Sequence, residues 1–375
     1  MPEQSTAEPK VMQLSNSTRH ALHEVGFDNE DTRAGTSILV DDRMEIAQSH
    51  MPGIEIMPLA EALRTYDFVQ DLMFGLVEPD ANADIAGVSD QRHDPVGHFI
   101  WVKPGAKVSL PVQSFTMMAT PQKRQFTHDI TLIDQGAQVE MISGAAVPEQ
   151  VHTGRHVSVH ETYLRAGARC TGVTIERWGA EMETASYSYA RQERGSFSRS
   201  TAIKLSTLRH DLSHSETEVE TDATCISQSI LLAPKDTERE LTTKIRLTGP
   251  NARAEDVARM VTTGGRIVND AVLIGESCDC AGYLGCDGLR LTPDGEISAT
   301  PALIARAERA QLSHEASVGM IAHDKLIYLM AAGLDEDAAR DLVVQGFLAP
   351  AQDWLPGALR GQIAAMIGAA RSGGM

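Results

Sequence analysis

The feature that most constrains the fold is a repeat of about 31 residues in the middle of the chain. Three segments, FIWVKPGAKVSL, ITLIDQGAQVEM and ETYLRAGARCTG, each contain a β-rich run, a Gly-Ala turn and a second alternating run. Their glycines, Gly105, Gly136 and Gly167, are 31 residues apart in both intervals. A short β unit cannot bury its apolar face alone, but stacked copies can. The repeat predicts a β-solenoid over about residues 80–312, with a β-sandwich as the alternative.

Helical patterns flank this β region. SNSTRHALHEVGF predicts a short helix capped by Ser or Asn and ended by Gly26, and another helical stretch covers residues 58–76. After the β region, HDKLIYLMAAG, LDEDAARDLVVQGFL and LPGALRGQIAAMIGAARSGG predict three helices. The predicted domains are an N-terminal helical region with a disordered start at 1–79, a β-helix core at 80–312 and a C-terminal helical region at 313–375.

Charge and hydropathy exclude several classes of function. The 375 residues carry a formal net charge of −18, which disfavours binding to nucleic-acid phosphates. No apolar stretch approaches the ~20 residues that cross a membrane, and the initial MPEQSTAEPK lacks the apolar core of a secretory signal. These features predict a cytoplasmic protein that binds neither membranes nor nucleic acid. Five cysteines, three of them clustered, make a poor disulfide framework.

The clustered cysteines lie in GESCDCAGYLGCDG with a C-x-C-x5-C spacing. Thiolates bind soft metals and carry sulfur, so Cys278, Cys280 and Cys286 are candidates for zinc, an iron–sulfur cluster or persulfide chemistry. The spacing differs from the C-x2-C pairs of zinc ribbons and from the C-x2-C-x2-C of ferredoxins. The alternative is that small thiols fill a narrow solenoid interior. We favour that packing role for the isolated Cys170 and Cys225.

Histidines form two further groups of candidate ligands. In QLSHEASVGMI, His314 and Glu315 are adjacent and would point to opposite faces of a strand. The imidazole can bind iron or zinc and the carboxylate can bind iron or orient the imidazole; the alternative is a histidine with structural contacts alone. In VHTGRHVSVHETY, His152, His156 and His160 recur every fourth residue, and a solvated row is favoured over a metal site. The sequence has no P-loop, G-x-S-x-G or H-E-x-x-H motif.

The C-terminal sequence resembles a known family. LSHEASVGMIAHDKLIYLMAAGLDEDAARDLVVQGFL is similar to the C-terminal signature of SufB and SufD, the scaffold subunits of the SUF iron–sulfur assembly machinery. The matching positions are His-Glu-Ala at 314–316, Val-Gly at 318–319, Leu-Ile-Tyr-Leu at 326–329, Gly-Leu at 333–334, Ala339 and Gly-Phe at 346–347. The resemblance covers most of residues 80–348. It implies a mainly β fold, with a right-handed parallel β-helix core and short N-terminal and C-terminal helices.

The resemblance also implies particular site residues. In SufB-like proteins a scaffold cysteine opens a Cys-Asp-x-Leu/Met run before the His-Glu-Ala motif, and here CDGLRL begins at Cys286, 28 residues before His314. Cys286, His314 and Glu315 are therefore the implied ligands of the cluster, and Cys278 and Cys280 are additional candidate ligands.

Several positions depart from the SufB pattern. Ser313 stands where SufB often has a glutamate, and Ala145 in SGAAVP stands where SufB has a cysteine that receives sulfur. Trp178 matches a family tryptophan but follows Glu176 and Arg177 instead of Gln and Asn. This mixture is similar to the short SufB/D-like proteins of minimal systems, in which one scaffold pairs with one ATPase.

The resemblance implies a scaffold that builds a transient iron–sulfur cluster, expected to be 4Fe–4S, and passes it to apo-proteins. The expected partner is a SufC-like ABC ATPase docked on the C-terminal helical region, and two scaffolds are expected to form a homodimer along solenoid edges. The chain itself is not expected to be an enzyme. Two alternatives are a SufD-like structural subunit without its own cluster, and a solenoid enzyme such as a polysaccharide lyase or hexapeptide acyltransferase.

Overall fold

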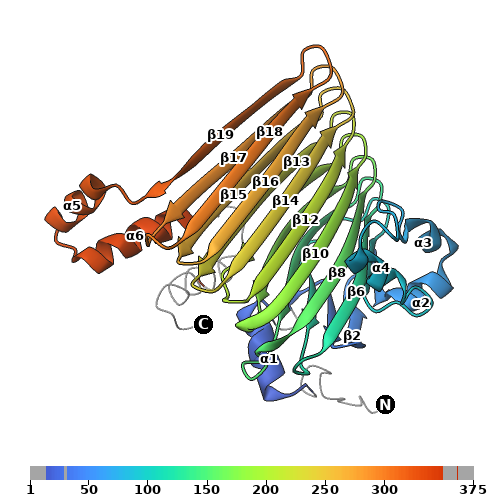
Figure 1. The fold of residues 1–375 in the computed structure, drawn as a ribbon. Helices are drawn as coiled ribbons and strands as arrows, with labels where there is room; N and C mark the ends of the chain where they lie inside the picture. Colours follow the sequence, from blue (N-terminus) through green and yellow to red (C-terminus); the bar gives the residue numbers. More distant parts are fainter. Residues whose placement is uncertain (1–13, 29–31, 349–360, 362–375) are drawn as a thin grey trace.

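The computed structural model describes residues 14–28, 32–348 and 361, and these form two long sheets of mainly parallel strands (Figure 1). Successive strands from β4 onward alternate between the sheets, so that one strand from each makes one turn of a β-solenoid. The solenoid has about eight turns, with short helices at both ends of the chain. The predicted mainly β solenoid fold is confirmed.

Sheet A contains, in spatial order, β2 (Arg43–Ser49), β1 (Gly35–Val40), β5 (Val112–Met117), β7 (Gln138–Ala146), β9 (Arg169–Arg177), β11 (Phe197–Lys204), β13 (Thr224–Pro234), β15 (Arg253–Thr263), β17 (Ala281–Arg290) and β19 (Gln311–Met320). Sheet B contains β3 (Ile54–Pro58), β4 (His98–Val102), β6 (Arg124–Ile133), β8 (Thr153–Leu164), β10 (Glu181–Gln192), β12 (His210–Val219), β14 (Glu238–Leu247), β16 (Arg266–Gly275) and β18 (Glu296–Ala305). The pairs β1–β2 and β3–β4 are antiparallel. The two sheets thus extend beyond residues 80–312 in both directions.

One corner of the solenoid is a stack of left-handed turns. Four turns place a glycine there with φ between +65° and +70°, and the next four place a non-glycine residue there with φ between +57° and +61°. In chain order these residues are Gly105, Gly136, Gly167, Gly195, Asp222, Asn251, Asp279 and Arg309. Asp and Asn tolerate this conformation because their side chains hydrogen-bond locally. The repeat that is visible three times in the sequence therefore continues through eight turns.

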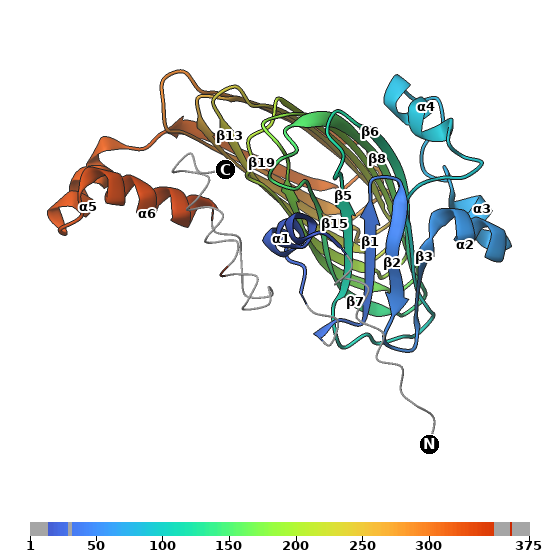
Figure 2. The same ribbon diagram turned by 90° about the horizontal axis from the view of Figure 1, so that it is seen from below.

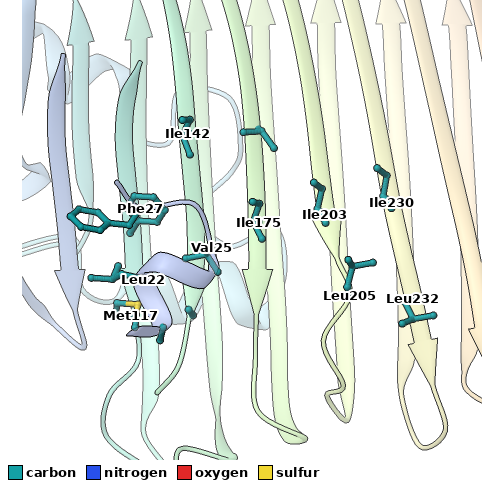
Figure 3. Packing of buried hydrophobic residues seen from close by; sticks show 14 of the residues in the cluster. Leu22, Val25, Phe27, Met117, Ile142, Ile175, Ile203, Leu205, Ile230 and Leu232 are labelled. Atoms are coloured by element: carbon teal, nitrogen blue, oxygen red, sulfur yellow. The ribbon is translucent and has the colours of Figure 1, made fainter. Parts of the chain in front are cut away.

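Helix α1 (Asn16–Glu24) covers the outer face of sheet A near its N-terminal end. The Ser15 side chain caps the helix by accepting a hydrogen bond from a backbone N–H of the first turn. Leu22, Val25 and Phe27 pack into an apolar cluster with isoleucines of β7, β9, β11 and β13 (Figure 3). Burial of each large apolar side chain contributes roughly 1.5–3 kcal/mol, so this contact fixes the predicted first helix on the solenoid.

The other helices lie at opposite sides of the solenoid (Figure 2). The helices that cover the outer face of sheet B are α2 (Leu59–Thr65), α3 (Asp67–Leu72) and α4 (Ala83–Ser89). The helices that follow the last strand are α5 (His323–Ala331) and α6 (Glu336–Leu348), and α6 packs on β15. Apart from residue 361, the third predicted C-terminal helix lies outside the described residues. Among the helices that the structure describes, none has the length and apolar character needed to span a bilayer.

Candidate functional site

Cys286 lies in the middle of β17 and faces the interior between the two sheets. Its side chain is 1% exposed and belongs to an apolar cluster with Leu231 and Met260 of sheet A and Ile267 of sheet B. Nδ2 of Asn269, on β16 of the opposite sheet, donates a hydrogen bond to Cys286 Sγ over 3.3 Å. The sulfur is therefore held inward, away from bulk water.

A buried carboxyl group lies on the same face as Cys286. Asp256 of β15 is 8% exposed and pairs in register with Leu284, two residues before Cys286. Burial raises the pKa of Cys286, and the nearby Asp256 carboxylate raises it further, while the hydrogen bond from Asn269 opposes the shift. Burial also raises the pKa of Asp256. The sequence does not single out Asp256 or Asn269, because one polar residue within a strand belongs to no motif.

His314 lies on the inner face of β19, the last strand of sheet A. It pairs in register with Leu284 of β17, while Ala316 pairs with Cys286. Paired residues of parallel strands share a face, so the imidazole lies on the same face as the Cys286 thiol, diagonally across two neighbouring strands. Because β19 ends the sheet, His314 is exposed to solvent. The structure therefore brings two of the predicted ligands to one face at the open end of the solenoid.

Glu315 lies on the opposite face, as its adjacency to His314 predicts for a strand. It pairs with Gly285, and its Oε2 accepts a hydrogen bond from the Tyr283 hydroxyl over 3.5 Å on the outer face of sheet A. Glu315 and Cys286 are thus on different sides of the sheet.

The other two clustered cysteines lie at the corner of left-handed turns. Cys280 directly follows Asp279 and is fully buried, at the place where six of the other seven turns have alanine. Cys278 lies in the turn itself and is partly exposed. Six residues of strand at about 3.3 Å each put Cys280 roughly 20 Å from Cys286, too far for one metal centre to bind both thiols. The structure therefore does not bring the three clustered cysteines together.

Cys170 and Cys225 also face the interior, on β9 and β13. Both pack in apolar clusters. Burial raises the pKa of Cys170 to about 12 and that of Cys225 to about 11, so both thiols are neutral at physiological pH. These environments fit the packing role predicted for them. Ala145, at the position where the resemblance implies a cysteine, packs beside Trp178.

The predicted histidine row is divided by the fold. His156 on the inner face of β8 is buried, stacks on Trp178 with ring centroids 5.0 Å apart, and places Nδ1 2.8 Å from Gln125 Oε1. His160 shares that face, whereas His152 precedes the strand and is exposed. The prediction of a solvated row is wrong for His156, because the second sheet covers the strand on this side.

We expect His156 to make the protein less stable in weak acid. Burial, followed by the proximity of His160 and Lys204 and opposed by Asp129, lowers the pKa of His156 to about 3, whereas an unfolded histidine titrates near pH 6.5. Its stabilising contribution is therefore complete above about pH 6.5 and is lost as the pH falls toward about 3. Between pH 7 and pH 5, the titration of His156 should therefore lower the free energy of unfolding by about 2 kcal/mol.

Urea unfolding at several pH values measures this effect. Between pH 7 and pH 5, the free energy of unfolding of His156→Gln should fall by about 2 kcal/mol less than that of the wild type. The matched control is His20→Gln on the exposed face of α1, which should keep the pH dependence of the wild type. Equal pH dependence in all three proteins would contradict a buried neutral His156.

Among the described residues, the one group of three potential metal ligands that lie close together is away from Cys286 and His314. His210, Glu238 and Glu240, on the outer face of sheet B, place one ligand atom each within 4.8 Å of one another. The carboxylates already have partners, because Arg266 bonds to Glu238 and His210 Nε2 lies 3.3 Å from Glu240 Oε1. These three side chains thus form part of a ladder of ion pairs between neighbouring strands, which explains their proximity without a metal ion.

Comparison with known proteins identifies the family. Residues 115–347 match the family model described as "SUF system FeS cluster assembly, SufBD core domain". The chain is 30% identical over 343 residues to an iron–sulfur cluster assembly SufBD family protein of Archaeoglobus fulgidus, covering 91% of this chain and 92% of that protein. It is 29% identical to a SufBD family protein of Methanothermobacter thermautotrophicus strain Delta H, covering 96% and 88% of the two chains. It is 25% identical to the iron–sulfur cluster assembly protein SufB of Bacillus subtilis, covering 69% and 57%. The chain therefore belongs to the SufBD family of iron–sulfur cluster assembly proteins.

Proposed function

We propose that this chain is a scaffold that builds an iron–sulfur cluster, expected to be 4Fe–4S, at the open end of its solenoid. The observation that carries the proposal is the placement of the Cys286 thiol and the His314 imidazole on one inner face of neighbouring strands, in a member of the SufBD family. Thiolate and imidazole both bind iron, and a site with few thiolates suits a cluster that must leave.

The site has to open before iron can reach Cys286, because the thiol is buried. On one side β17 is covered by β19, which pairs with no further strand among the described residues. Helix α5 begins at His323, three residues after β19 ends at Met320. A partner that holds α5 can therefore move β19, together with its His314, outward to admit iron at Cys286 and then return it to complete the site, a rigid-body type of switch.

The surface suited to such a partner lies on α5 and α6. The helices carry exposed apolar side chains, with Ile327 53%, Tyr328 75% and Leu342 51% exposed. A groove of about 370 Å³ between the helices is lined by Asp324, Lys325, Tyr328, Leu329 and Val343. Exposed apolar surface of this kind marks interaction sites. We assign it to a SufC-like ABC ATPase, whose nucleotide cycle would supply the movement of β19.

Tyr328→Asp is expected to weaken binding of the ATPase by at least tenfold, about 1.4 kcal/mol, because the charge removes an exposed aromatic anchor. Co-purification and calorimetric titration with a SufC-like ATPase would measure the loss. Leu110→Asp is the matched control, since Leu110 is also exposed but precedes β5 far from α5. Equal binding by wild type and Tyr328→Asp would place the ATPase elsewhere.

The open end of the solenoid also suits a second copy of the chain. Ile304 of β18 and Val318 and Met320 of β19 are 39%, 44% and 53% exposed, and both strands leave one backbone edge unpaired among the described strands. Two copies meeting there would each contribute a cysteine and a histidine, giving the four ligands that a 4Fe–4S cluster takes. Light scattering of the complex with the ATPase should give two copies of each chain.

Cluster transfer tests the proposed function as a whole. The chain, loaded anaerobically with iron and sulfide, should convert an apo-ferredoxin to its cluster-bound form in the presence of an iron chelator. Free iron and sulfide should not convert the apo-ferredoxin under the same conditions. If the chain takes up no cluster with the ATPase present, the SufD-like structural role takes the place of the scaffold role.

A further inference from the structure

Asn269 is a buried polar side chain in an apolar part of the solenoid interior. It lies on the inner face of β16, is 2% exposed, and shares that face with Ile267 and Ala271. The paired position is Leu241 on β14 in the preceding turn and Ala299 on β18 in the following turn. An amide buried among apolar side chains costs free energy unless a hydrogen bond compensates it. An asparagine at this position therefore needs an explanation.

The hydrogen bond of this amide goes to the Cys286 thiol. Nδ2 of Asn269 donates to Cys286 Sγ over 3.3 Å, across the interior from sheet B to sheet A. Within the described part of the chain, this is the one hydrogen bond that the Asn269 side chain makes. A thiol is a weak acceptor, whereas a thiolate bound to a metal carries charge and accepts a stronger hydrogen bond. The amide is therefore better suited to a sulfur that binds iron than to a free thiol.

The strand that carries Asn269 can keep this contact while the site opens. Asn269 lies on β16, which pairs with β14 on one side and with β18 on the other. His314 lies on β19, the strand that moves in the proposed function, and β19 belongs to the other sheet. Because β16 and β19 do not pair, movement of β19 removes His314 from the site and leaves Asn269 opposite Cys286.

We propose that Asn269 is a positioning residue for the cluster and acts through Cys286. This inference rests on the proposed scaffold function. The N–H of Asn269 holds Sγ in place while iron and sulfide arrive, and it remains as a hydrogen bond to the cysteine sulfur of the finished cluster. Hydrogen bonds to the sulfurs of an iron–sulfur cluster raise its reduction potential, because they stabilise the more negatively charged, reduced state. Asn269 thus affects both the retention of the cluster and its potential.

Substitution by leucine, which has a similar size and no donor, tests this role on the full chain loaded anaerobically with iron and sulfide, with the ATPase present. Asn269→Leu should lose the cluster to an iron chelator about tenfold more readily, as the loss of a hydrogen bond to a charged group does. A redox titration of the bound cluster should give a more negative reduction potential than in the wild type. Thr243→Val on β14 is the matched control, because Thr243 bonds to Ser215 and not to Cys286, and it should leave both quantities unchanged.

A purely structural role for Asn269 predicts a different result. Asn269→Leu exchanges a buried amide for an apolar group, so it should melt no lower than the wild type. Asn269→Ala is a second variant without a donor and should show the same shift of the potential. Asn269→Gln keeps an amide donor and should have a potential closer to that of the wild type.

The outcomes separate this inference from the function on which it rests. Wild-type cluster retention and potential in Asn269→Leu and Asn269→Ala would overturn the inference and leave the scaffold function standing. An unchanged cluster in Cys286→Ser would overturn the scaffold function at this site.

Discussion

Replacing Arg239 by methionine should destabilise the folded protein by about 3–5 kcal/mol. The guanidinium is fully buried between the sheets, where Nη1 donates to Asp211 Oδ2 over 2.8 Å. Nε and Nη2 donate to the carbonyl oxygens of Leu232 and Ser206 over 2.8 and 2.6 Å. Methionine fills similar space but removes the hydrogen bonds to two buried carbonyls and leaves Lys204 as the one cation in contact with Asp211 among the described residues. Such a loss is a large share of the 5–15 kcal/mol that stabilises a typical domain.

Arg246→Met on the same strand is the matched control for this prediction. Its guanidinium side chain is 40% exposed and pairs with Glu276 over 2.8 Å on the outer face. An exposed pair of this kind contributes at most about 1 kcal/mol. Urea unfolding of both variants, followed by circular dichroism, measures the difference. Equal losses would show that the buried network around Arg239 is not what stabilises the middle of the solenoid.

Cys286→Ser should lower the iron and sulfide retained after anaerobic reconstitution by at least about tenfold, because a hydroxyl is a poor substitute for a thiolate ligand. The thiol is buried on the inner face and the substitution is nearly isosteric, so folding should be preserved. Bound iron, acid-labile sulfide and visible absorption measure the effect. Melting temperature serves as the check on folding.

Two other cysteines of the same cluster provide controls. Cys280→Ala restores the residue that most other turns have at this corner, and should change stability by less than about 1 kcal/mol and leave the cluster in place. Cys278→Ser alters a partly exposed turn and should also retain the cluster. Loss of the cluster in Cys280→Ala, together with retention in Cys286→Ser, would move the site to the corner of left-handed turns.

The solenoid could be predicted from the sequence because one corner of each turn requires a left-handed backbone conformation, which favours glycine. Gly105, Gly136 and Gly167 mark the left-handed corner at a constant interval. The later turns were hidden because Asp222 and Asn251 adopt the same conformation without glycine, at intervals that vary by a few residues. A search for Gly, Asp or Asn followed by a small residue would have found most of them. That pattern also identifies Cys280 as a packing position.

The candidate site was predictable in part. The resemblance pointed to Cys286 and His314, which the strand register places on one face. Strand alternation alone predicts that the Glu315 side chain points to the opposite face of the sheet from His314. Asp256 could not be found this way, because its position depends on how β15 pairs with β17, 28 residues later in the chain. Local patterns predict the elements, whereas the register between distant strands determines which side chains meet.

The central claim is that a cluster is built on the inner face at the open end of the solenoid. Mössbauer spectroscopy of the chain loaded with isotopically enriched iron and sulfide, with the ATPase present, tests it most directly. The account predicts the spectrum of an iron–sulfur cluster in the wild type, and its loss in Cys286→Ser. A spectrum of iron bound by oxygen and nitrogen alone, or one unchanged in Cys286→Ser, would contradict it.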